Sequence, residues 1–298
     1  MDIVTILRGG LGNQLFQYAC VRNLQLAAKA NVFMEKEIGF LVDKRYQRSF
    51  ELEGLIEKNN LNHSTLVRKL FLCEKIGTRV SAKVGNLLTQ FLGYQMIFDD
   101  HNKYVDILAN ASSRRIYLSG YWQSELYFKE FKTRIAKEIA DWLIRYLNEL
   151  EESMIMYPRK EESVAIGIRT YSETKHPAFH AKDGVEKTVA DWQKAIDIAL
   201  KELHAPVFYV FSTDHEEIVR ELNFRNSNVI RVNQDRIRTS QGRLISFASC
   251  KHHIFNNSSF FWWGAYVAPY IFPRSRSLVI ASNNFLNAAS HPRHWNTF

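Results

Sequence analysis

The N-terminal part of the chain contains a glycine-rich turn of a kind that binds anions or sugars. The segment RGGLGNQ, residues 8–14, lies between a short apolar run and residues with helical apolar spacing. Glycines at such a turn let the backbone approach a ligand, and the first turn of the helix offers unpaired N–H donors. The alternative is a tight turn with a structural role only. The predicted ligand contacts are Gly10, Gly12, Asn13 and Gln14.

A second candidate site lies near the other end of the chain. Ser258 and Ser259 directly precede a predicted helix. Their hydroxyls and the N–H groups of the first helical turn would form a second phosphate cradle. Trp262 and Trp263 follow on the same helix, where we expect them to lie in the core rather than stack on a ligand.

Alternating strands and helices must position these residues. Short apolar runs occur at residues 3–7, 32–34, 115–118, 164–168, 207–211, 229–232 and 253–255. Segments with helical spacing separate them, at residues 15–30, 129–151, 189–203, 216–222 and 243–250 and after Ser259. This alternation predicts parallel sheets covered by helices on both faces, with ligands at the C-terminal ends of the strands. The polar segment 153–163, which contains Pro158, divides the chain into predicted domains 1–155 and 156–298.

Composition excludes several classes of protein. The 298 residues are 46% apolar, which excludes a disordered or low-complexity chain. Three cysteines without a C-x-x-C pair argue against a disulfide framework or a structural zinc site and favour a reducing cytosol. We detect no targeting signal, and the uncharged stretch 254–273 contains polar residues and Pro269, which favours a buried helix over a membrane span. The net charge of +8 indicates an anionic partner.

Much of this positive charge lies in residues 58–98, an insert that we predict to form one or two basic amphipathic helices. Apolar residues interleave with the charged ones, and the insert contains a single acid, Glu74. Either these helices present a solvated face over a core, or they make peripheral contact with an anionic membrane. Nucleic acid is not an expected partner, because the aromatic residues follow apolar periodicity rather than stacking motifs. The basic residues are Lys58, Arg68, Lys69, Lys75, Arg79 and Lys83.

Three ordered blocks resemble one enzyme family. GGLGNQLFQYA, at residues 9–19, resembles the N-terminal signature of the α-1,2-fucosyltransferases, glycosyltransferase family 11. LSGYWQSELYF (118–128) and CKHHIFNNSSFFWWGAY (250–266) are similar to its middle and C-terminal blocks. The resemblance implies a GT-B-like α/β fold of two Rossmann-like lobes with parallel sheets flanked by helices. The first lobe would face the acceptor and the second would bind the GDP-sugar.

The segment VAIGIRTYSE, residues 164–173, departs from the family pattern. At this strand end the family carries His-x-Arg-Arg-Gly-Asp, whose arginine lies on the β-phosphate of the GDP-sugar. Here Gly167 replaces the histidine, Arg169 keeps the first arginine, and Thr170 replaces the second. A guanidinium at this point would stabilise the charge that builds on the leaving diphosphate. Glu173 is the carboxylate nearest to the motif and is the expected catalytic base, with Asp183 and Glu125 as alternatives.

The remaining expectations concern the base of the nucleotide and the need for metal. Asp214, in FSTDHEE, matches a similar acidic run of the family and would accept hydrogen bonds from guanine, although a helix N-cap is the alternative. No Asp-x-Asp motif occurs in the chain, so we expect no metal and no cofactor, with arginine and helix N-termini neutralising the diphosphate.

The expected function is inverting, metal-independent transfer of L-fucose from GDP-β-L-fucose to a glycan hydroxyl, galactose O2 for an α-1,2 linkage. The resemblance places it in the synthesis of bacterial surface polysaccharide, in the cytoplasm or at the inner face of the membrane. Two alternatives stay open: a transferase for another GDP-sugar or linkage, and a non-catalytic relative that binds nucleotide or glycan.

Overall fold

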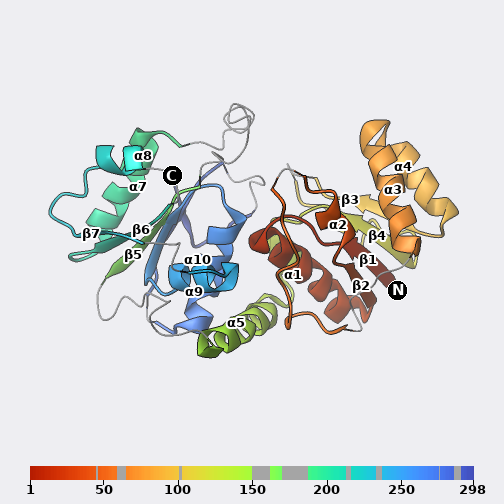
Figure 1. Ribbon diagram of the computed structural model, residues 1–298, viewed down its shortest axis with the longest axis horizontal. Coiled ribbons are helices and arrows are strands. Elements are labelled where there is room, and N and C mark those ends of the chain that lie inside the picture. Colours follow the sequence, from red (N-terminus) through yellow and green to blue (C-terminus); the bar gives the residue numbers. More distant parts are fainter. Residues whose placement is uncertain are drawn as a thin grey trace. The chain divides into compact units, whose positions relative to one another are not determined.

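The computed structural model divides the chain into two compact units, residues 1–135 and 136–298, which are described separately (Figure 1). It describes residues 1–44, 46–58, 65–100, 103–149, 162–169, 187–212, 216–232, 237–274, 276–284 and 290–298. Most of the predicted boundary segment 153–163 lies outside these residues. The domain limits 1–155 and 156–298 therefore remain a prediction.

The N-terminal unit is built around a four-stranded parallel sheet with the strand order β2-β1-β4-β3. Both faces of the sheet carry helices, as alternating strands and helices require. Its elements are β1 (Asp2–Ile6), α1 (Leu11–Ala28), β2 (Asn31–Glu35), α2 (Ile38–Leu41), α3 (Thr65–Arg79), α4 (Ala82–Phe91), β3 (Gln95–Phe98), β4 (Arg115–Ser119) and the 3-10 helix η2 (Glu125–Phe128). Helix α5 (Lys132–Glu149) crosses into the second unit.

Helices α3 and α4 confirm that the basic insert forms amphipathic helices, but the insert is not helical throughout. Val67, Leu70 and Phe71 of α3 are buried against Val4 of β1 and Tyr117 of β4. Two glycines bring the helices close together, because a β-carbon on Gly77 would lie 2.8 Å from the Cα atom of Gly85. The last four residues of the insert form β3, the edge strand beside β4. The apolar run after the turn at Gly93 pairs with β4 instead of extending α4.

The C-terminal unit contains a six-stranded parallel sheet with the order β10-β9-β8-β5-β6-β7. The parallel arrangement predicted from the alternation of strands and helices is confirmed in both units. The elements of this unit are β5 (Ser163–Gly167), α7 (Val189–Glu202), β6 (Val207–Phe211), α8 (Glu216–Glu221), β7 (Val229–Arg231), α9 (Ser240–Ala248), β8 (His252–Phe255), α10 (Ser259–Ile271), β9 (Val279–Ala281) and β10 (Asn296–Thr297).

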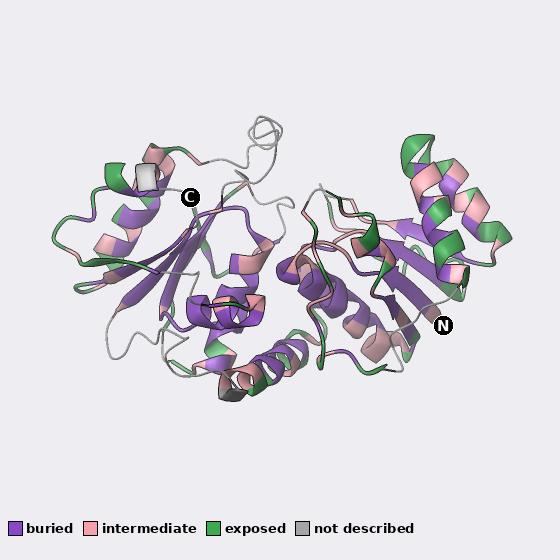
Figure 2. Cartoon of the chain, viewed as in Figure 1, coloured by how far each residue is buried: buried purple, intermediate pink, exposed green. Residues whose placement is uncertain are grey.

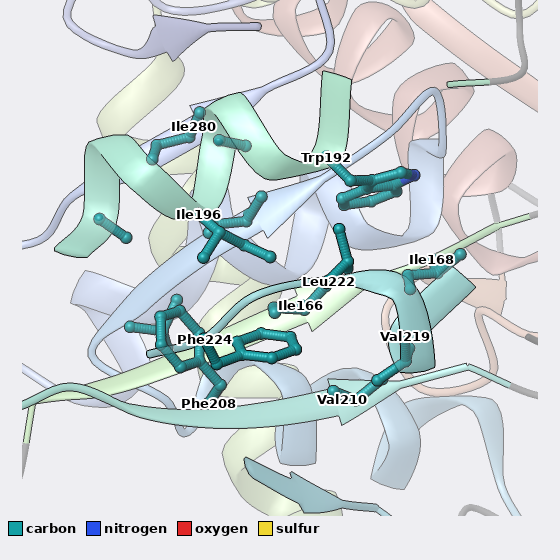
Figure 3. Close-up of a cluster of buried hydrophobic side chains, with 14 of the residues drawn as sticks. Ile166, Ile168, Trp192, Ile196, Phe208, Val210, Val219, Leu222, Phe224 and Ile280 are labelled. Atoms are coloured by element: carbon teal, nitrogen blue, oxygen red, sulfur yellow. The ribbon is translucent and has the colours of Figure 1, made fainter. Parts of the chain in front are cut away.

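A continuous apolar core holds α7 and α8 against one face of this sheet (Figure 3). Trp192 and Ile196 of α7 pack over Ile166 of β5 and Phe208 of β6, and all four are buried. Burial of large side chains of this kind stabilises the fold by about 1.5–3 kcal/mol each. The core therefore fixes the position of β5, at whose C-terminal end Arg169 lies.

Helix α10 is a buried helix of 13 residues that follows β8. Trp262 and Trp263 on it are fully buried, which confirms the prediction that they belong to the core. Within the described part of the chain, no helix has the length and apolar character needed to cross a membrane. His253 is also fully buried, and burial lowers its pKa to about 3, so it lies neutral in the core.

Candidate active site

The strand order of the C-terminal unit creates a switch point between β5 and β8. From β5 the chain proceeds to β6 and β7 on one side, and from β8 it proceeds to β9 and β10 on the other. In open parallel sheets, ligands bind outside the C-terminal ends of strands at such a point, because the two following loops diverge there. Arg169 follows β5, and residues 256–259 follow β8. Arg169 and the Ser258–Ser259 pair are far apart in the sequence. They nevertheless lie at the C-terminal ends of two neighbouring strands.

Asn256 holds the backbone of Arg169 at this switch point. The Arg169 N–H donates to Oδ1 of Asn256 over 2.9 Å, and Nδ2 of Asn256 donates to the Arg169 carbonyl oxygen. The Asn256 N–H also donates to the Gly167 carbonyl over 3.4 Å. Asn256 is buried, whereas Arg169 is half-buried. The Asn256 carboxamide therefore extends the hydrogen bonding between β5 and β8 beyond the ends of the strands. It fixes the backbone position of Arg169.

Ser258 and Ser259 lie at the N-terminus of α10, as predicted. Ser258 is the N-cap: its Oγ accepts a hydrogen bond from the Phe261 N–H over 3.4 Å. This cap uses a lone pair of the hydroxyl oxygen and not its hydrogen. Ser259 is the first residue of the helix and is half-buried. The positive end of the α10 dipole thus lies at the same sheet edge as Arg169.

Phe261 explains how the chain accommodates Gly167, where the family pattern has histidine. A β-carbon on Gly167 would lie 2.6–2.8 Å from ring atoms of Phe261. This ring is buried and packs against Phe247 with a centroid distance of 4.7 Å. The Phe261 ring therefore occupies the space that any side chain at position 167 would need.

In the N-terminal unit the predicted glycine turn joins the central strand β1 to α1. Gly9 has φ +78°, a conformation that favours glycine, and Gly10 is the N-cap of α1. The guanidinium of Arg48 lies beside this turn, with Cζ and Nε 3.8 Å from where a β-carbon on Gly10 would lie. Gly12 is buried in the first turn of the helix. A guanidinium and a helix N-terminus therefore meet here, which favours an anionic ligand.

Gln14 has a different role from the one expected. Its side chain is fully buried, and its amide N–H groups donate to the carbonyl oxygens of Gly9 (2.8 Å) and Ser49 (2.9 Å). Its carbonyl oxygen accepts from the Glu51 N–H over 2.9 Å. Both donors are therefore used within the chain. Gln14 positions the glycine turn and the segment that carries Arg48, and we no longer expect its side chain to contact the GDP-sugar.

Asn13 is connected to the loop that follows β4, the other central strand. Nε2 of Gln123 donates to Oδ1 of Asn13 over 2.7 Å. In the same loop Trp122 has φ +58°, which is unusual for a bulky residue, and its N–H donates to Asp99 over 2.8 Å. Backbone strain of this kind persists only where surrounding contacts enforce it, and it is common at functional sites. Sequence reasoning missed Gln123 and Asp99 as supports of this site.

A buried ion pair links the glycine turn to α3. The Arg8 guanidinium donates to both carboxylate oxygens of Glu74 over 2.7 and 3.0 Å, and the Tyr117 hydroxyl donates to the same carboxylate. Burial opposes the charge on Arg8 and Glu74. The hydrogen bonds and opposite charges outweigh it, so the pKa of Arg8 is raised and that of Glu74 is lowered. Burial and the neighbouring carboxylate raise the pKa of Tyr117. The pair therefore stays ionised.

Glu173, Asp183 and Asp214 lie outside the described residues. Glu125 is described and forms an ion pair with Lys132, with Nζ and Oε1 3.1 Å apart. Among the described residues no group of three or more His, Cys, Asp or Glu side chains is arranged to hold a metal ion. Metal independence remains a prediction.

The family model for glycosyl transferase family 11 matches residues 2–289, nearly the whole length of the chain. The chain belongs to glycosyl transferase family 11. The resemblance of its three motif blocks to this family is thereby confirmed, and the protein is a glycosyltransferase. As a family 11 member it is 27% identical over 274 residues to an alpha-1,2-colitosyltransferase of Escherichia coli, covering 90% of this chain and 88% of that protein.

One solved structure shows that this family 11 glycosyltransferase has the predicted GT-B fold. A mutant of Arabidopsis thaliana FUT1 in complex with GDP superposes with a TM-score of 0.52 at 10% identity, covering 95% of this chain and 72% of that chain. POFUT1 in complex with GDP gives a TM-score of 0.42 at 12% identity, covering 94% and 97% of the two chains. At 10% identity the likeness to FUT1 concerns the fold alone.

Proposed function

We propose that this family 11 glycosyltransferase transfers L-fucose from GDP-β-L-fucose to O2 of a galactose residue, with inversion, forming an α-1,2 linkage without metal. The observation that carries the proposal is the position of Arg169, which Asn256 holds at the β5–β8 switch point beside the N-terminus of α10. A guanidinium and a helix dipole at one sheet edge would form a diphosphate site that needs no metal ion.

In the proposed reaction the acceptor hydroxyl oxygen attacks C1 of the sugar as the bond from C1 to the β-phosphate oxygen breaks. The bonding electron pair leaves with GDP, so negative charge grows on the β-phosphate. Arg169 and the N–H groups at the start of α10 would stabilise that charge. The hydroxyl proton passes to a carboxylate, for which we propose Glu173, with Asp183 and Glu125 as alternatives. The Glu125 carboxylate already forms an ion pair with Lys132, so we propose it only after the other two.

The remaining proposed contacts follow from the sequence. Gly10, Gly12 and Asn13 would bind the GDP-sugar through the turn that Gln14 supports, and Asp214 would recognise guanine. Ser258 can donate its hydroxyl hydrogen to a phosphate oxygen while it caps α10, and Ser259 can do so as the first residue of that helix. GDP-bound proteins of similar fold and the family assignment support a nucleotide-sugar donor and a glycan acceptor.

A second donor is favoured by a specific observation. The E. coli relative is named for transfer of colitose with the same α-1,2 linkage, and colitose lacks one hydroxyl group that fucose has. Gly167 and Phe261 change the very segment in which the family pattern has histidine. GDP-colitose is therefore the alternative donor, and a binding protein without turnover is the alternative function.

A donor panel tests the proposal. Purified protein is incubated with GDP-fucose, GDP-colitose, GDP-mannose and UDP-galactose, each with a β-galactoside, and release of the nucleotide and formation of the product are measured. The proposal predicts that GDP-fucose gives the highest kcat/KM and an α-1,2-linked product. Preference for GDP-colitose would assign the alternative donor, and GDP binding without product would assign the non-catalytic role.

We also propose a place for this reaction in the cell. Assembly of a surface polysaccharide or O-antigen in bacteria supplies galactose-containing acceptors at the inner face of the cell membrane. An enzyme using GDP-sugar would work there from the cytoplasm. A preceding galactosyl transfer must supply the acceptor, because the proposed linkage is made to galactose.

A further inference from the structure

We propose that the α3–α4 hairpin is a docking surface for an anionic lipid bilayer. The hairpin surface is defined by basic and apolar side chains: Arg68, Lys69, Leu72, Lys75, Arg79, Val80, Lys83, Leu87 and Phe91. The proposal rests on the proposed function in one respect: docking would place the enzyme beside a membrane-bound acceptor. Its test is independent of catalysis.

The only acidic side chain of the α3–α4 hairpin is buried. Glu74 is the one acid in residues 58–98, and it is 2% exposed in its ion pair with Arg8. The surface charge of α3 and α4 is therefore entirely positive. Among the described residues none of the five basic side chains of the hairpin surface has an ion-pair partner. A set of cations that the chain itself leaves without counter-charges favours an anionic partner.

Helical geometry gathers three of these cations, Arg68, Lys75 and Arg79, on one side of α3. Arg68, Leu72, Lys75 and Arg79 follow one another at spacings of four, three and four residues, which places them on one face of the helix. The opposite face, with Val67, Leu70 and Phe71, is buried against the sheet. The exposed face of α3 is thus a basic stripe on a helix that the core holds in place. Figure 2 shows the exposed and half-buried residues along α3 and α4.

Exposed apolar side chains distinguish this surface from an ordinary solvated basic face. Leu72, Val80, Leu87 and Phe91 are 60%, 69%, 54% and 81% exposed. Large apolar side chains interleaved with lysine and arginine suit the boundary between lipid headgroups and acyl chains. A nucleic acid would gain from the cations but would leave the aliphatic side chains of Leu72, Val80 and Leu87 in water. The combination therefore favours a bilayer.

Several contacts fix the hairpin to the rest of the N-terminal unit. The close approach of Gly77 to Gly85 packs the two helices together, and Ser81 caps α4 by accepting from the Val84 N–H. The Arg8–Glu74 ion pair connects α3 to the turn between β1 and α1. Docking of the hairpin surface would therefore hold the glycine turn at a fixed position relative to the membrane.

The test is flotation of the full chain with phosphatidylcholine vesicles, with and without phosphatidylglycerol. We expect flotation with the anionic vesicles only. Each lysine near an anionic surface contributes about fivefold to binding, so K69A/K83A should bind roughly twenty-five-fold more weakly. The matched control K194A/K201A removes two exposed lysines of α7 and should bind like the wild type. L87S/F91S should also lose binding while keeping all cations.

Several results would overturn the proposal: no flotation, equal flotation with neutral vesicles, equal losses in K69A/K83A and K194A/K201A, or displacement from vesicles by added tRNA. A concentration-dependent dimer that L87S/F91S abolishes, without vesicle binding, would assign the surface to a second copy of the chain. Release of GDP with a soluble β-galactoside should be the same in K69A/K83A and the wild type. Failure of the proposed transfer would appear in that assay and not in flotation.

Discussion

The side chain of Asn256 bonds both backbone polar groups of Arg169, although the two residues are 87 positions apart in the chain. This contact exists because β5 and β8 are neighbours in the sheet and end together. It replaces the next pair of ladder hydrogen bonds with a carboxamide. The main chain at Arg169 is thereby fixed, and its guanidinium has a defined origin from which to reach a diphosphate.

Asn256→Asp should therefore cause a large fall in kcat. The carboxylate can still accept from the Arg169 N–H but cannot donate to the Arg169 carbonyl, which leaves two oxygens facing each other. Misplacing a positioned group by about an ångström costs up to roughly a hundredfold in rate. We expect a loss of that order in kcat with a much smaller change in KM.

Ser163→Ala is the matched control for this variant. Its hydroxyl is buried at the other end of β5 and accepts from the Lys251 N–H over 2.9 Å. Loss of such a buried contact costs about 1–3 kcal/mol of stability, as for Asn256, but leaves Arg169 in place. If the two variants lost kcat equally, Asn256 would have no positioning role.

The contact between Gly167 and the Phe261 ring predicts that substitutions at the two positions have non-additive effects on the free energy of unfolding. Gly167→Ala should cost about 1–3 kcal/mol, because the new methyl group would meet the Phe261 ring. In a Phe261→Ala background, itself about 3–5 kcal/mol less stable, the same change should cost almost nothing. Urea unfolding of the four proteins measures the coupling. Equal costs in both backgrounds would show that the ring does not fill this space.

The Arg8–Glu74 ion pair predicts a large loss on truncation. Glu74→Ala leaves the Arg8 guanidinium buried without its counter-charge and should cost about 3–5 kcal/mol. Glu53→Ala, which removes an exposed ion pair with Lys36 at 4.0 Å, should cost no more than about 1 kcal/mol. Chemical denaturation distinguishes the two. A loss at Glu74 as small as that at Glu53 would contradict the burial of the pair.

Buried histidine predicts a pH dependence of stability. The pKa of His253 is lowered from 6.5 to about 3 by burial, so below pH 6.5 the unfolded chain takes up a proton that the folded chain does not. Stability should therefore be highest above pH 6.5 and fall towards pH 3, by up to about 1.4 kcal/mol per pH unit from this residue. In His253→Leu the slope between pH 6.5 and 4.5 should decrease by up to one proton. An unchanged slope would refute the assignment.

Local patterns in the sequence predicted most strands and helices, because apolar spacing records which face of each element is buried. They missed β3, a short run next to α4 whose strand character depends on pairing with β4. They also placed Ser258 and Ser259 before a helix, whereas Arg169 was predicted from the resemblance to the family. They could not show that Asn256 contacts Arg169 or that Phe261 fills the space beside Gly167, because both depend on strand order. Glu74 gave a visible signal as the lone acid among cations, but its partner Arg8 lies 66 residues away.

The proposed diphosphate site predicts that activity does not depend on a metal ion. If Arg169 and the start of α10 neutralise the diphosphate, dialysis against EDTA should leave the transfer rate unchanged, and added Mn²⁺ or Mg²⁺ should not raise it substantially. A loss of activity in EDTA that Mn²⁺ restores would show that a metal ion carries the charge instead.

Arg169→Ala tests whether the Arg169 guanidinium stabilises the leaving diphosphate. The measurement is kcat for transfer from the preferred GDP-sugar, with the thermal unfolding midpoint and GDP affinity measured on the same samples. We predict a fall in kcat of roughly a hundred- to a thousandfold with an unchanged midpoint. Arg169→Lys should recover only part of it, because an ammonium cannot bind a diphosphate through two parallel hydrogen bonds. Near-normal turnover by Arg169→Ala would contradict the account.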